Sequence, residues 1–172
     1  PGLCYRSQAS PRRTEAASHA RPSPERRAGP RGAPPVTVLV CGEALYDVFL
    51  GDPTPGGVAL DARRGGAAFN VAIGLARLGL RAGLFAGVGT DALGEGIAQA
   101  LAREGVETGF LRRKDRRTTL ALVALGADGG AGYAFYGEGA ADRALTEADL
   151  PALAGVEALM FGCLSLLAEP TG

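Results

Sequence analysis

The pattern of hydrophobic and polar positions changes near residue 36, and beyond it the chain alternates between predicted strands and helices. An uninterrupted apolar run, Val36–Cys41, ends at a glycine, which is typical of a strand buried on both faces. Two helices, each followed by a glycine, are expected at 67–78 and 92–104. Further strands are expected at 46–50, 58–60, 81–88, 109–112 and 158–161. This order predicts an α/β fold with a mostly parallel sheet that is covered by helices.

A second pattern predicts a small accessory sheet. Residues 118–125 and 132–136 flank the glycine-rich segment 126–130, which is typical of a β-hairpin. The connection is too short to cross over a sheet, so we expect these strands, with 58–60, to pair antiparallel. We expect an apolar side built by Leu120, Leu122 and Ala124 with Tyr133 and Phe135 opposite.

Residues 1–35 have a different composition from the rest of the chain. They contain seven of the 11 prolines and seven arginines against two acidic residues, with no hydrophobic periodicity. Such a segment buries too little apolar surface to offset its conformational entropy. We expect a disordered Pro/Arg-rich extension, and the alternatives are a transit peptide or a basic arm.

Composition narrows the classes of function. The 172 residues carry 18 basic and 18 acidic side chains, and this balance gives no reason to expect a nucleic-acid partner. The apolar runs are too short to cross a bilayer, so no membrane partner is expected. Three widely separated cysteines fit neither a disulfide framework nor a metal cluster, and a reducing, cytoplasmic location is expected. The single histidine, His19, lies in the Arg/Pro-rich segment, which argues against histidine-based catalysis or zinc binding.

One glycine-rich segment, Gly87-Val-Gly-Thr-Asp-Ala92, fits the dinucleotide-binding pattern between a strand and a helix. Asp91 argues against a nucleotide there, because it would place a carboxylate where a pyrophosphate should lie. The alternative is a tight turn in which Asp91 interacts favourably with the helix dipole.

A second segment, Gly65-Gly-Ala-Ala-Phe-Asn70, is a candidate for ligand binding. Two glycines allow a ligand to approach the backbone, and the Asn70 amide can both donate to and accept from a sugar hydroxyl. Asp47, which follows the first strand, could contribute a carboxylate. For Asn70 the alternative is a plain helix cap, and for Asp47 an acid in a surface turn.

Together these segments resemble the ribokinase/pfkB family of carbohydrate kinases. The resemblance rests on Gly42-Glu-Ala-Leu-Tyr-Asp47, on 65–79 and on Gly87-Val-Gly-Thr-Asp-Ala-Leu-Gly94. The segments Phe135–Asp142 and Phe161–Ser165 resemble its fructokinase-like branch. In this family the turn at 87–92 is not used for a dinucleotide, so the resemblance argues against that interpretation.

The resemblance implies a ribokinase-like three-layer sandwich with a small antiparallel lid sheet. It implies that Asp47, Gly65, Gly66 and Asn70 line a sugar pocket, and that the complete enzyme uses ATP and Mg²⁺. It also implies a homodimer formed through the lid sheet. The implied reaction is phosphorylation of a sugar hydroxyl, most closely that of a fructokinase.

The sequence departs from the family at one point. The glycine-rich Asp-Thr-x-Gly-Ala-Gly-Asp-like stretch, which supplies the catalytic aspartate and the anion hole, does not occur in the 172 residues. We therefore expect 36–172 to be the amino-terminal, sugar-binding part of a kinase, truncated at the carboxyl end, with no catalytic residue of its own and no activity alone. The alternatives are a 2-keto-3-deoxygluconate, ribose or nucleoside kinase, or a non-catalytic sugar-binding or oligomerisation module.

Overall fold

The computed structural model describes residues 37–125, 131–169 and 171. The predictions for residues 1–35 and for the hairpin tip at 126–130 lie outside these residues. No helix in the described part of the chain is long and apolar enough to cross a membrane.

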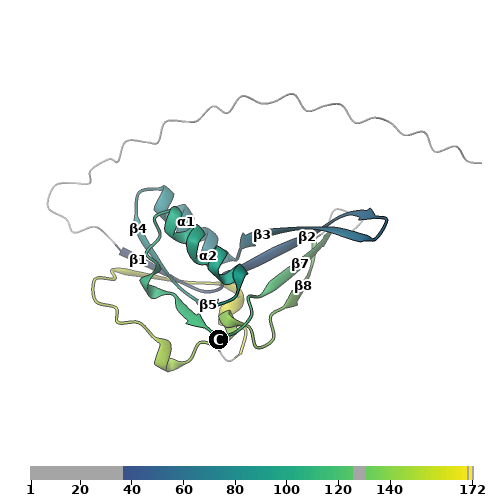
Figure 1. Cartoon of the computed structure of the whole chain (residues 1–172). Coiled ribbons are helices and arrows are strands. Elements are labelled where there is room, and N and C mark those ends of the chain that lie inside the picture. Colours follow the sequence, from purple (N-terminus) through teal and green to yellow (C-terminus); the bar gives the residue numbers. More distant parts are fainter. Residues whose placement is uncertain (1–36, 126–130, 170, 172) are drawn as a thin grey trace, which may run out of the picture. The chain divides into compact units, whose positions relative to one another are not determined.

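The main sheet is parallel and has its earliest strand in the middle (Figure 1). Strand β1 (Thr37–Cys41) lies between β4 (Arg81–Phe85) and β9 (Ala158–Phe161). Both neighbours run in the same direction as β1, as the alternation of strands and helices predicts. The predicted α/β fold is confirmed.

Alternate residues of the main sheet face two separate apolar clusters. Val40 and Leu84 pack under helices α1 (Ala67–Arg77) and α2 (Ala92–Arg103), which lie on one face of the sheet. Leu39 points to the other face. There it packs with three further side chains, Cys41, Phe85 and Leu145. Four short 3-10 helices lie in the remaining connections: η1 (Thr108–Phe110), η2 (Ala141–Arg143), η3 (Glu147–Asp149) and η4 (Cys163–Leu166).

Two strand predictions differ from the structure. The strand expected at 81–88 is divided into β4 and the short β5 (Gly87–Gly89). The strand expected at 109–112 is mostly the 3-10 helix η1, and strand β6 (Arg112–Lys114) follows it. β5 and β6 pair in parallel as a separate two-stranded sheet.

The accessory sheet has four strands in the order β3-β2-β7-β8 (Figure 1). They are β2 (Leu45–Thr54), β3 (Gly57–Gly65), β7 (Leu120–Leu125) and β8 (Ala131–Tyr136). The sequence prediction left β2 out of this sheet and made β3 too short. The residues around Pro53 are typical of a turn, so the sequence does not indicate a strand there. In the structure β2 continues through them with an irregular register between Leu50 and Pro53.

The pairing of the accessory sheet is mixed, so the prediction that all its strands are antiparallel is wrong. β2–β3 and β7–β8 are antiparallel hairpins, whereas β2 and β7 run parallel. The long connection through both helices returns the chain to β7 in the same direction as β2. The faces also differ from the prediction, since Phe135 pairs with Ala121 and Tyr133 with Val123 rather than with Leu120 or Leu122.

Candidate functional site

The carboxylate of Asp47 lies against Gly65, where the β2–β3 hairpin enters helix α1. Asp47 belongs to strand β2 of the accessory sheet, and not to a surface turn. A Cβ built on Gly65 would collide with the Asp47 carboxylate. The Asp47 carboxylate thus fits here only because residue 65 is a glycine and has no side chain.

Gly66 begins helix α1 in a conformation that other residues rarely adopt. Its φ is 102°, and a Cβ there would lie 2.6 Å from the carbonyl oxygen of Glu43. The loop before β2 therefore passes close to the start of α1 only because residue 66 is a glycine. Together the two glycines bring Asp47 beside the first turn of the helix.

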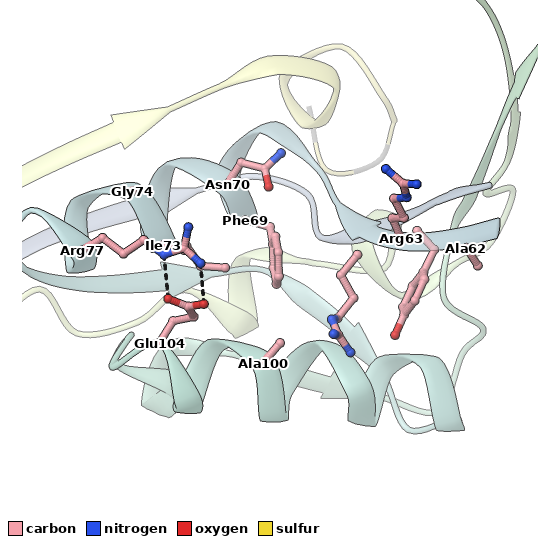
Figure 2. Close-up of a pocket in the computed structure, with 11 residues that line it drawn as sticks. Ala62, Arg63, Phe69, Asn70, Ile73, Gly74, Arg77, Ala100 and Glu104 are labelled. Atoms are coloured by element: carbon pink, nitrogen blue, oxygen red, sulfur yellow. Dashed lines mark hydrogen bonds and ion pairs between the residues drawn. The ribbon is translucent and has the colours of Figure 1, made fainter. Parts of the chain in front are cut away.

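Asn70 lies in the first turn of α1, and its side chain is exposed. Figure 2 shows its amide pointing to the same side as Arg63 and away from helix α2. The alternative of a plain helix cap is not what the structure shows, since the N-cap is Gly66 and the Ala67 N–H donates to the Glu43 carboxylate over 3.1 Å. The Asn70 amide is thus free to contact a ligand on that side.

Asp47 retains acceptor capacity. No donor within the described residues hydrogen bonds to its carboxylate, and burial raises its pKa above the ordinary value. Arg63, which pairs with it across the strands, instead bonds to Asp61 at 2.6 and 2.9 Å and lies 5.3 Å from the ring centre of Phe49. A ligand hydroxyl that donated to Asp47 would supply the missing hydrogen bond.

Asp91 caps helix α2 and does not belong to a nucleotide site. Its Oδ1 accepts from the Gly94 N–H at 2.7 Å and the Thr118 hydroxyl at 2.6 Å, and its Oδ2 accepts from the Thr118 N–H at 2.8 Å. Burial acts to raise the pKa of Asp91, but these hydrogen bonds outweigh it and hold the pKa below its ordinary value. The carboxylate occupies the position that a pyrophosphate would need, so the dinucleotide interpretation fails.

Two buried carboxylates near the site were not assigned a role from the sequence. Glu43 is 3% exposed and bonds to both helix α1 and Ser165. Asp142 is 4% exposed and accepts a hydrogen bond from the Thr119 hydroxyl, and burial raises its pKa. In the sequence each of these acids lies beside alanines and glycines, as in Gly-Ala-Ala-Asp142, and each falls in a segment that carries the family resemblance.

A cavity of about 650 Å³ lies near these residues but does not contain most of them. Of the four predicted sugar-binding residues, only Asn70 borders it. Asp47 alternates along β2 with Tyr46, which does line the cavity, so the Asp47 side chain points to the opposite face of the sheet. The structure therefore places Asp47 and Gly65 in contact, with Gly66 adjoining, apart from the cavity.

Comparison with known proteins agrees with this architecture. Residues 38–169 match the model of the pfkB family carbohydrate kinases. The chain belongs to the pfkB family of carbohydrate kinases. It is 43% identical over 136 residues to the fructokinase of Rhizobium leguminosarum bv. trifolii. This alignment covers 78% of this chain and 41% of the Rhizobium protein.

Solved structures in the comparison show the same fold. A crystal structure of the fructokinase from Xylella fastidiosa aligns with a TM-score of 0.72 and 28% identity, over 78% of this chain and 43% of that one. A structure of the Xylella fastidiosa fructokinase with bound ATP aligns with a TM-score of 0.70 and 30% identity, over 78% of this chain and 41% of that one. The chain thus spans about two fifths of the length of the proteins it matches. The resemblance to the pfkB family, its fructokinase-like branch and its ribokinase-like fold is confirmed.

Proposed function

We propose that this chain is the sugar-binding part of an ATP-dependent kinase that phosphorylates a hydroxyl of fructose. The observation that carries the proposal is the Asp47 carboxylate, which is held against Gly65 with no donor from the described residues. A half-buried carboxylate in need of donors is suited to the hydroxyls of a sugar. Family membership and the fructokinase relatives support the same conclusion.

In this proposal Asp47 and Asn70 have complementary roles. Asp47 only accepts hydrogen bonds when it is ionised, whereas the Asn70 amide both donates and accepts. Gly65 and Gly66 let the sugar approach the backbone at the start of α1. The four-stranded accessory sheet, which contributes Asp47, acts as the lid that closes over the sugar and excludes water from phosphoryl transfer.

ATP and Mg²⁺ are proposed for the complete enzyme, and the Xylella fastidiosa fructokinase with bound ATP supports the nucleotide. The residues that the structure describes do not fit either group. The N-termini of α1 and α2 already receive carboxylates, from Glu43 and Asp91. The described residues contain no group of three side chains able to hold a metal ion. We therefore assign no step through nucleotide or metal to these residues.

The 172 residues also contain no Gly-Ala-Gly-Asp-like stretch to supply a base for the sugar hydroxyl. We expect the purified chain alone to form no ADP from ATP in the presence of fructose, because loss of base and anion hole costs several orders of magnitude in rate. Fructose-dependent ADP formation above a control without protein would contradict this part of the proposal.

We further propose that two copies associate through the accessory sheet. Large apolar side chains are exposed on three of its strands, among them Leu50, Val58, Leu60, Tyr133 and Phe135. Tyr133 and Phe135 also stack, with ring centres 6.2 Å apart. The strand register places Tyr133 and Phe135 on the face of the sheet that carries Asp47, and Leu50 and Leu60 on the opposite face. Exposed apolar side chains on a sheet are typical of an interface.

Calorimetric titration of the 172-residue chain with fructose tests the sugar site. We expect Asp47→Asn to weaken binding about tenfold or more, because the amide replaces an acceptor of charged hydrogen bonds. Asp52→Asn is the matched control, since Asp52 is an exposed acid on the same strand, and we expect it to bind fructose as the wild type does. Unchanged affinity in a folded Asp47→Asn variant would remove Asp47 from the site, and absence of fructose binding by the wild-type chain would overturn the proposal.

A further inference from the structure

The 650 Å³ cavity lies on the face of the accessory sheet opposite Asp47, between that sheet and the two helices. Figure 2 shows Phe69 of α1 pointing toward α2, on which Ala100 lies. The same view shows Arg77 and Glu104 joined across the two helices, with hydrogen bonds of 2.6 and 2.8 Å. The cavity thus has an apolar middle and one end bordered by an ion pair.

The other end of the cavity carries a cation and a phenol. Arg64 of β3 and Tyr46 of β2 are direct partners across the strands, and both line the cavity. Both reach helix α2, because a Cβ built on Gly96 would lie 2.7 Å from the Tyr46 hydroxyl and 3.9 Å from Arg64 Nη1. Within residues 37–125 and 131–169, no carboxylate forms a salt bridge with Arg64.

We propose that this cavity is a second small-molecule site that binds an organic anion. A phosphate or carboxylate group would accept from the Arg64 guanidinium and the Tyr46 hydroxyl. The apolar body of the ligand would lie over Phe69 and Ile73, toward the end of the cavity that the ion pair borders. Concave sites with an apolar lining and a few convergent polar groups are the usual form of small-molecule sites.

Such a ligand would join two parts of the fold. Tyr46 and Arg64 belong to the accessory sheet, whereas Phe69 and Ile73 belong to helix α1. Binding therefore holds the β2–β3 hairpin against the helices and slows hydrogen exchange of its amides. The binding itself does not depend on the proposal that the chain binds fructose.

The neighbouring arginine provides a matched control. Arg63 also borders the cavity, but its side chain points away from α2 in Figure 2 and bonds to Asp61 over 2.6 Å. Arg63 and Arg64 have the same charge and occupy consecutive positions of one strand. Replacing either one changes the net charge equally, so only a local contact distinguishes them.

Phenyl phosphate is a suitable probe, because it combines a phosphate with an apolar ring. Calorimetric titration of the 172-residue chain with phenyl phosphate is expected to show saturable binding. Inorganic phosphate alone and phenol alone are each expected to bind only weakly. Arg64→Gln is expected to weaken phenyl phosphate binding about tenfold to a hundredfold through loss of charged hydrogen bonds. Arg63→Gln is expected to change it less than twofold. Equal loss in the two variants, or no saturable binding, would overturn the proposal.

A second variant keeps the test valid if Arg64→Gln fails to fold. Gly74 lies on α1 at the cavity, and a Cβ built there meets no atom within 4 Å. Gly74→Leu should therefore fold while its side chain occupies part of the cavity, and phenyl phosphate binding should fall at least tenfold. Full binding by Gly74→Leu would show that the ligand lies elsewhere. Retained fructose binding in this variant would separate the second site from the sugar site.

Discussion

Ser165 donates its hydroxyl hydrogen to Glu43 Oε2 over 2.8 Å, although the two residues lie 122 positions apart in the sequence. The other oxygen of the same carboxylate accepts from the Ala67 N–H at the start of α1. Through these two hydrogen bonds, Glu43 connects the segment after β9 to helix α1, which carries Asn70. This buried acid thereby helps to hold the helix on which a predicted sugar-binding residue lies.

Replacement of Glu43 by alanine is expected to destabilise the fold. It would leave the Ala67 N–H and the Ser165 hydroxyl without their acceptor in a partly buried place, at a cost of about 1–3 kcal/mol in the free energy of unfolding. Urea denaturation followed by circular dichroism measures this cost. Glu157→Ala, which removes an exposed acid, is the control and should change the free energy of unfolding by less than about 0.5 kcal/mol. Equal effects of the two changes would show that the buried contact contributes nothing.

Gly65→Ala is expected to displace the Asp47 carboxylate. The added methyl group would occupy the space of that carboxylate, and overpacking of this kind costs about 1–3 kcal/mol in stability. Fructose affinity should fall as well, because Asp47 loses its position. Gly57→Ala, at the opposite end of the same strand, adds a methyl group in open space and is expected to leave affinity unchanged. A Gly65→Ala variant with wild-type fructose affinity would argue against the Asp47 site.

The sequence predicts the strands and helices of the main sheet well, and for a physical reason. Residues 38–41 and the two helices are buried on the faces that their patterns indicate, so hydrophobic period and structure agree. The long hairpin β2–β3 could not be predicted in the same way. Most of its residues are exposed on both faces, so the apolar alternation that marks a half-buried strand is absent.

The types of residue in the candidate site could be predicted from the sequence, but the contacts between them could not. The glycine pair and the amide at 65–70, and the carboxylate of Asp47 after the first strand, indicate ligand binding, and the resemblance to a family favours it over a helix cap or a surface turn. The sequence could not show that Glu43, rather than Asn70, caps helix α1, because that contact depends on how the loop before β2 passes the helix. Nor could it show that Tyr46 and Arg64 face a cavity on the other side of the sheet, since this depends on strand register.

Two helical glycines are expected to respond in opposite directions to the same change. Gly74→Ala should stabilise the chain by about 0.5–1 kcal/mol, since alanine is the better helix former and the new methyl group meets no atom. Gly96→Ala should destabilise it despite the same gain in helix propensity, because its methyl group would lie 2.7 Å from the Tyr46 hydroxyl. Urea denaturation of both variants checks the sign of each effect. A stabilised Gly96→Ala variant would show that Tyr46 moves away without cost.

Leu60→Lys is expected to weaken self-association if the accessory sheet forms the dimer interface. Leu60 is 60% exposed on β3, and a charge there would have to be desolvated on association. Analytical ultracentrifugation should show the dissociation constant raised at least tenfold. Leu78→Lys is the control, because Leu78 is also an exposed leucine but lies at the end of α1, outside the sheet. A monomeric wild-type chain at all concentrations, or equal effects of the two variants, would exclude this interface.

Fructose affinity is expected to depend on the ionisation of Asp47. Burial raises the pKa of Asp47 above its ordinary value of 3.8, and the ionised carboxylate is the form that accepts hydrogen bonds from the sugar. Affinity should therefore be constant at neutral pH and fall, by about tenfold for each pH unit, once the pH drops below this raised pKa. The opposite sign holds for stability. The protonated carboxyl is the form better tolerated by the fold, so the contribution of Asp47 to stability is greatest below its unfolded pKa and is lost as the pH rises through the folded pKa.

Calorimetric titrations with fructose at a series of pH values check this dependence, with circular dichroism at each pH to confirm that the chain remains folded. Asp47→Asn is the decisive comparison, because its amide does not ionise. The variant should bind fructose weakly and with no change in affinity across the pH range in which the wild type loses it. The same variant should be at least as stable to urea at neutral pH as the wild type, since it no longer buries a charge. If the variant kept the wild-type pH profile, a carboxyl group other than Asp47 would control sugar binding.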